Sequence, residues 1–160
     1  MRVNSWLRLG LLTGALSCAD PGLPSKLERT NLLRALIADS RADIALVEIR
    51  AVVVMTERGC LPCTKAFSKL MENHVEDPSV LFWVSASGQG LDISAYQATP
   101  TQVIWDHDDR LRSTGILEGS GAILLRHGAI DTIIDLEARG LEGSLQYIIA
   151  DLEKTSSDPL

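Results

Sequence analysis

Two cysteines, Cys60 and Cys63, are separated only by Leu61 and Pro62. An apolar run at residues 46–55 precedes them and apolar residues at helical spacing follow, so we expect them where a buried strand leads into a helix. Unpaired backbone N–H groups and the helix dipole stabilise a thiolate at such a position and lower its pKa from about 8.5. The pattern therefore predicts a dithiol redox site, in which Cys60 attacks a partner disulfide and Cys63 resolves the mixed disulfide.

Two other interpretations of the pair stay open. Buried cysteines can pack as small apolar residues without any redox role. A zinc or copper site would need further Cys or His ligands, and the available histidines, none at ligand-like spacing, are His74, His107 and His127. We therefore expect no metal, and no cofactor other than a redox-active Cys60–Cys63 disulfide.

The elements around the pair alternate between strands and helices. Apolar runs at residues 46–55, 80–84 and 102–106 predict three strands. Apolar residues after Cys63 recur every three or four positions, which predicts a helix that Pro78 would end. The chain is therefore expected to form an α/β domain with a central mixed β-sheet flanked by helices.

The run Ala98-Thr99-Pro100-Thr101 stands directly before the third of these strands. The order of strand, CxxC helix, strand and Thr-Pro strand resembles the thioredoxin fold family over residues 44–153. The CxPC form is similar to thioredoxin itself, and the Thr-Pro-Thr run is similar to that of extracytoplasmic reductases of the TlpA/ResA kind. The resemblance implies a thioredoxin-like fold in which Thr99–Pro100 is a cis bond that faces the CxxC and offers backbone to the substrate.

A second register of the same pattern is also open. Residues 115–128 show the strand-and-turn rhythm that follows the cis proline in the family, but Ser120 stands where the proline would be. We prefer Pro100. The segment 115–140 is then longer than a minimal domain needs, which suggests an extra strand pair or a helix.

Two positions next to the motif depart from the family. Gly59 stands where thioredoxins usually carry Trp, so substrate packing beside the first cysteine is expected to differ. Val54 stands where thioredoxins keep a buried Asp that handles the proton of Cys63. Glu48, Glu57 or water must take that proton instead.

Four further segments have clear local signals. Ser25 to Glu28 has the form of a capping box and predicts a helix over residues 26–38. Residues 106–110 are polar and predict a solvated turn between two strands, in preference to a cation site, because their spacing matches no EF-hand loop. Residues 126–128 predict a hairpin turn, and a closing amphipathic helix is expected from Leu141.

Residues 1–19 have the profile of a secretory signal, with two arginines before an apolar run and small residues after it. Cys18 resembles the lipidated cysteine of a bacterial lipoprotein. Cleavage after Ser17 or Ala19 by an ordinary signal peptidase is an alternative, as is an N-terminal amphipathic helix of a cytoplasmic protein. We expect a periplasmic or otherwise extracytoplasmic protein, with lipid attachment at Cys18 as one form of membrane anchoring.

The chain has 160 residues, 46% of them hydrophobic, which suits one domain with an ordinary core. We expect a signal at residues 1–19, a linker at 20–25, the domain at 26–154 and a loose tail at 155–160. The formal charge of −6 and the lack of a basic cluster argue against nucleic acid as a partner. The expected protein is a monomer.

Together, the motif and the resemblance imply an enzyme, a thiol:disulfide oxidoreductase that reduces disulfides of extracytoplasmic proteins. A membrane redox partner would keep its dithiol reduced. A disulfide oxidant or isomerase is the alternative within this class. A metal-binding module or a thioredoxin-like scaffold with idle thiols is the alternative outside it.

Overall fold

The computed structural model describes the chain at residues 24–41, 43–57, 61–74, 76–85 and 102–155. In chain order these ranges contain α1 (Lys26–Ser40), the 3₁₀ helix η1 (Leu46–Glu48), β1 (Ala51–Thr56), α2 (Leu61–His74), β2 (Val80–Ser85), β3 (Val103–Trp105), α3 (Arg110–Ser113), β4 (Gly121–Arg126), β5 (Ala129–Asp135) and α4 (Leu141–Thr155). No helix in these ranges has the length and apolar character needed to cross a bilayer.

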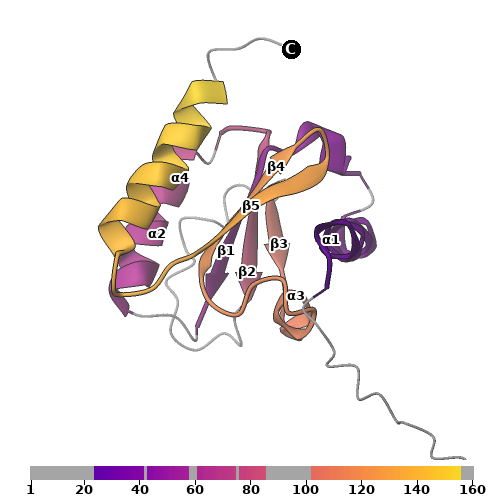
Figure 1. Cartoon of the computed structure of the whole chain (residues 1–160), viewed down its shortest axis with the longest axis horizontal. Helices are drawn as coiled ribbons and strands as arrows, with labels where there is room; N and C mark the ends of the chain where they lie inside the picture. Colours follow the sequence, from indigo (N-terminus) through magenta and orange to yellow (C-terminus); the bar gives the residue numbers. More distant parts are fainter. Residues whose placement is uncertain (1–23, 42, 58–60, 75, 86–101, 156–160) are drawn as a thin grey trace, which may run out of the picture.

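The strands form one five-stranded sheet in the order β3-β2-β1-β4-β5. β1, β2 and β3 are parallel, β4 is antiparallel to β1, and β5 is antiparallel to β4. β1 is therefore the middle strand, with Thr56 level with Ser85 of β2 at their carboxyl ends. This arrangement confirms the predicted α/β fold with a central mixed sheet flanked by helices (Figure 1).

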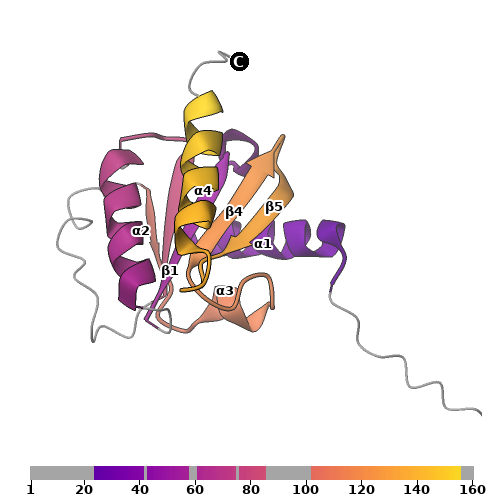
Figure 2. The same ribbon diagram turned by 60° about the vertical axis from the view of Figure 1, so that its left-hand side comes forward.

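Helices cover both faces of the sheet, α2 and α4 on one and α1 and α3 on the other (Figures 1 and 2). Side chains of β1 alternate between two core clusters. The cluster under α2 and α4 includes Ala51, Val53, Met55, Cys63, Phe67, Leu70, Leu136, Ile148 and Leu152. The cluster under α1 and α3 includes Leu33, Ile37, Val52, Val54, Trp83, Leu111 and Ile123. A middle strand buried on both faces has to be apolar at successive positions, which explains the unbroken apolar sequence of β1.

The predicted strand at residues 46–55 begins too early. Leu46–Glu48 form η1, and β1 starts only at Ala51. Leu46 and Ile49 are buried while Val47 and Glu48 between them are exposed, so the apolar residues follow a spacing of three, as in a 3₁₀ turn, and not the alternation of a strand.

The three long helices that the sequence predicts are confirmed. α1 begins at Lys26 with the predicted capping box, in which the Glu28 N–H donates to Ser25 Oγ at 3.3 Å and Glu28 Oε2 accepts from the Ser25 N–H at 2.7 Å. α4 begins at Leu141 as predicted. α2 ends at His74, before Pro78, because the Asp77 N–H donates to the His74 carbonyl at 3.1 Å and closes a turn.

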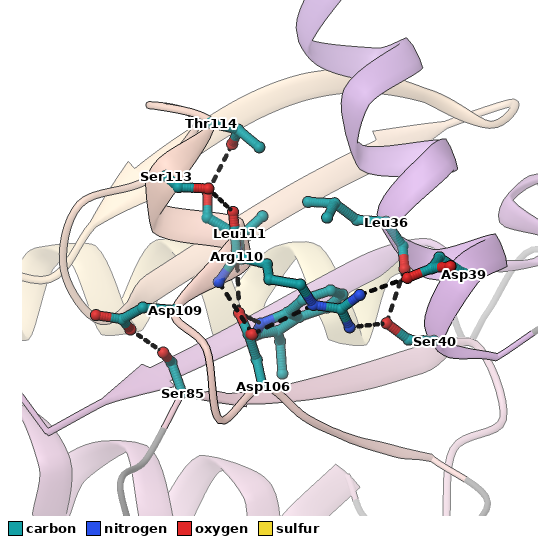
Figure 3. Close-up of polar contacts among 11 residues, drawn as sticks. Leu36, Asp39, Ser40, Ser85, Asp106, Asp109, Arg110, Leu111, Ser113 and Thr114 are labelled. Atoms are coloured by element: carbon teal, nitrogen blue, oxygen red, sulfur yellow. Dashed lines mark hydrogen bonds and ion pairs between the residues drawn. The ribbon is translucent and has the colours of Figure 1, made fainter.

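The predicted polar turn at residues 106–110 is present at His107 and Asp108, but it joins β3 to α3 and not two strands, and Asp106 in it is buried. The carboxylate of Asp106 is buried and accepts hydrogen bonds from the N–H groups of Arg110 and Leu111, both at 3.0 Å (Figure 3). It also accepts from Trp83 Nε1 at 2.9 Å, so it ties the start of α3 to β2. A carboxylate oxygen is a good acceptor for the N–H groups in the first turn of a helix, which have no partner within the helix.

The predicted hairpin turn at residues 126–128 is confirmed between β4 and β5. His127 and Gly128 both have positive φ, 52° and 73°, which is the backbone of a two-residue turn that suits the twist of the strands. The segment 115–140 thus contains a strand pair, as one of the two options suggested. This pair is part of the central sheet, since β4 pairs directly with β1.

Candidate active site around Cys63

Cys63 lies in the first turn of α2, just past the carboxyl end of β1, as the sequence predicts. Its side chain is fully buried, at 0% exposure, and belongs to the core cluster under α2 and α4. Its sulfur is disulfide-bonded. The chain's two other cysteines, Cys18 and Cys60, lie outside the described residues, so the Cys60–Cys63 pairing stays a prediction.

The other motif residues are described only in part. Leu61 and Pro62 form the start of α2, and Pro62 is exposed there. A proline in the first turn removes no helical hydrogen bond, because the N–H groups of that turn have no partner within the helix. Gly59 lies outside the described residues.

The backbone of Leu136, in the segment after β5, contacts the sulfur of Cys63. Its carbonyl oxygen lies 3.4 Å from Cys63 Sγ, which is within hydrogen-bond reach of a thiol. Leu136 directly follows β5 and is itself buried. In the reduced protein the Cys63 S–H can donate to this carbonyl. The contact fixes where the sulfur lies.

Ser120 holds the neighbouring segments together. It is fully buried at the head of β4, and its Oγ accepts from the Thr56 N–H at 3.1 Å. Its carbonyl accepts from the Leu136 N–H at 2.8 Å. One residue thus connects the end of β1, which leads toward the CxxC motif, with the segment whose carbonyl contacts Cys63.

The hydroxyl of Thr56 is an unusual feature of this cluster. The residue is 3% exposed, and its Oγ1 has no hydrogen-bond partner within the part of the chain that the structure describes. A buried hydroxyl that stays unpaired costs free energy.

Of the two segments proposed to present substrate backbone, the structure describes only the one that contains Ser120. Thr99 and Pro100 lie outside the described residues, so their cis bond and their role stay predictions. β3, the strand that follows them, is at the edge of the sheet and is separated from β1 by β2. β4, headed by Ser120, is the antiparallel neighbour of β1.

The acidic residues considered as acceptors of the Cys63 proton lie at different ends of β1. Glu48 precedes β1. The strand itself is roughly 16 Å long, from five steps of about 3.3 Å, so Glu48 lies at least one strand length from the end that leads to Cys63. Glu57 directly follows Thr56 at the Cys63 end, and its N–H donates to the Ser85 carbonyl at 3.3 Å. The geometry thus favours Glu57 or water over Glu48.

One more carboxyl group, which the sequence analysis did not single out, lies near the Cys63 end of the sheet. Asp135, the last residue of β5, precedes Leu136. Although Asp135 is exposed, partial desolvation of its carboxyl group, and then the negative charges of Glu137 and Glu118, raise its pKa above the usual range. Leu136 belongs to the core cluster that contains Cys63, and the alternation of side chains puts Asp135 on the opposite face of the sheet.

His74, a suggested metal ligand beside the cysteines, lies at the far end of α2. Eleven residues of helix separate it from Cys63, or roughly 16 Å at 1.5 Å per residue, so these two side chains cannot share a metal ion. Burial, followed by the charge of Arg50, lowers the pKa of His74. No group of three or more His, Cys, Asp or Glu suited to a metal occurs among the described residues.

No protein-family model matches the chain, and a search of curated proteins finds no similar sequence. Any functional assignment therefore rests on the chain's own residues and geometry.

Proposed function

We propose that this protein is a thiol:disulfide oxidoreductase with a thioredoxin-like fold, acting through the Cys60 and Cys63 thiols. One observation carries the proposal. Cys63 is disulfide-bonded and fully buried in the first turn of a helix that follows the middle strand of the sheet. A CxxC pair at such a turn combines an accessible first thiol with a sheltered second one.

The proposed reaction transfers two electrons to a partner disulfide. The thiolate of Cys60 attacks one partner sulfur, forms a mixed disulfide and releases the other partner sulfur as a thiolate. Cys63 then loses its proton to Glu57 or water and attacks Cys60, which frees the partner as a dithiol and leaves the Cys60–Cys63 disulfide. The carbonyl of Leu136 holds the Cys63 thiol in place until that second step.

The CxPC form and the Thr-Pro-Thr run favour the reducing direction, because they are similar to those of reductants. We assign the protein to an extracytoplasmic compartment, with disulfide-containing proteins as substrates and a membrane donor that restores the dithiol. Two segments are candidates for presenting substrate backbone: Thr99–Pro100 and the head of β4 at Ser120. The pairing of β4 with β1 supports the second.

The test is reduction of insulin by dithiothreitol with the full-length protein as catalyst. Cys60→Ser is expected to abolish the acceleration, and Cys63→Ser to trap a mixed disulfide with the substrate. Cys18→Ser is the control and should keep full activity. Activity of Cys60→Ser equal to that of the wild type would overturn the proposal.

A further inference from the structure

A groove of about 680 Å³ runs along the N-terminal part of α4 and is open to solvent. Its lining residues, from one face of α4 and the loop before it, are Ala138, Gly140, Leu141, Glu142, Leu145, Gln146 and Ile149. The apolar members Leu141, Leu145 and Ile149 are half-buried and pack against the core cluster that contains Cys63. An open groove with an apolar floor suits an extended polypeptide segment better than an enclosed small molecule.

The groove begins close to the candidate active site. Ala138 is two residues beyond Leu136, whose carbonyl oxygen lies 3.4 Å from Cys63 Sγ. Two residues span at most about 7 Å, so the near end of the groove lies within roughly 10 Å of that sulfur. Figure 1 shows the chain between β5 and α4 passing beside the first turn of α2. A segment bound in the groove could thus continue directly to a cystine at the CxxC motif.

The one charged residue among the lining residues that the structure describes is negative, Glu142. Glu137 and Arg139, on either side of Ala138, are both exposed, and neither lines the groove. The Glu142 carboxylate therefore favours a cationic segment over an acidic one.

We infer that the groove binds an extended segment of the protein substrate next to its cystine, with an apolar side chain on the Leu141–Leu145–Ile149 floor and a Lys or Arg opposite Glu142. This inference rests on the thiol:disulfide exchange proposed above. It specifies the substrate class as protein disulfides flanked by apolar and basic residues.

The test uses full-length protein reduced beforehand and three cyclic disulfide peptides that differ only in the two residues after one cysteine: Leu-Lys, Leu-Glu and Ser-Lys. The rate of a single exchange is measured by acid quenching and mass spectrometry. The protein dithiol becomes a disulfide as the peptide disulfide becomes a dithiol, so no further reactant is needed. The protein variants are Glu142→Lys and the matched control Glu153→Lys, an exposed position of the same helix.

The Leu-Lys peptide is expected to react fastest. Because one exposed charge pair contributes up to about 1 kcal/mol, Glu142→Lys should slow the Leu-Lys peptide about 5-fold and speed the Leu-Glu peptide by a similar factor. Glu153→Lys should change either rate less than about 2-fold, since surface charges act weakly at a distance. Equal rates for the three peptides, or equal effects of the two variants, would overturn the groove assignment.

A small neutral disulfide, bis(2-hydroxyethyl) disulfide, separates the two levels of the inference. If it oxidises the protein dithiol while the peptides show no preference, only the groove assignment is wrong. If neither it nor any peptide oxidises the dithiol, the proposed exchange itself is wrong and the groove assignment with it.

Discussion

The sulfur of Cys63 and the carbonyl oxygen of Leu136 are 3.4 Å apart, although 73 positions separate the two residues in the chain. The contact joins the first turn of α2 to the segment between β5 and α4. That segment is held in turn by the hydrogen bond from the Leu136 N–H to the Ser120 carbonyl. The backbone contact of the buried sulfur thus comes from the segment after β5, on the antiparallel side of the sheet.

Ser120→Ala should destabilise the protein by about 1–3 kcal/mol, because it leaves the buried Thr56 N–H without its acceptor. The measurement is the free energy of unfolding in urea. Ser113→Ala is the control: its hydroxyl is exposed and bonds only within α3, so a change under about 0.5 kcal/mol is expected. Equal effects at the two positions would contradict the role given to Ser120.

Thr56→Val should stabilise the protein by about 1 kcal/mol, because it replaces a buried hydroxyl that has no partner among the described residues with a methyl group of similar shape. Thr30→Val is the matched control with the opposite expected sign. The Thr30 hydroxyl is buried too, but it donates to the Lys26 carbonyl at 2.9 Å and accepts from the Ile130 N–H at 3.1 Å. A loss of stability in both variants would show that Thr56 has a partner.

Asp106→Asn should cost about 3 kcal/mol, because hydrogen bonds to a charged group are worth about 1.5–3 kcal/mol each, and the amide is neutral and keeps only one of the two acceptor oxygens. The donors are Trp83 Nε1 and the N–H groups of Arg110 and Leu111. Unfolding followed by tryptophan fluorescence measures the loss. Asp108→Asn, an exposed change two residues along the same turn, should alter stability by less than about 0.5 kcal/mol.

Asp135→Asn should raise the melting temperature at pH 7. The folded protein raises the pKa of Asp135 above its usual 3.8, so the folded state holds the proton more tightly than the unfolded state does. Wild-type stability therefore falls as pH rises from 3.8 through the folded-state pKa, and the amide avoids that loss. The difference between the two proteins should vanish below pH 3.8, where both side chains are neutral. A lower melting temperature for the variant at pH 7 would contradict this sign.

Much of the fold follows from local sequence signals. The capping box at Ser25 and the positive-φ turn at His127–Gly128 act within a few residues, so the sequence predicts them correctly. The α/β class follows in the same way, from apolar runs that alternate with helical spacing. Such signals do not depend on distant parts of the chain.

The features that sequence reasoning missed depend on long-range contacts. The Asp106 carboxylate accepts hydrogen bonds from Trp83 and from N–H groups of α3, and these bonds position the start of that helix. No short sequence pattern predicts them. Leu136 contacts Cys63 through a backbone carbonyl, which any residue type would supply. The hydrogen bonds of Ser120 to Thr56 and Leu136 likewise join segments far apart in the chain, which no local pattern predicts.

The equilibrium reduction potential of the Cys60–Cys63 pair tests the central proposal most directly. Full-length Cys18→Ser protein is equilibrated in a series of dithiol redox buffers, its free thiols are trapped, and the disulfide is mapped by mass spectrometry. We predict a Cys60–Cys63 disulfide with a potential near about −270 mV, as in a reductant. A value near about −120 mV would reverse the direction to that of an oxidant, and failure to form this disulfide across the series would contradict the redox function itself.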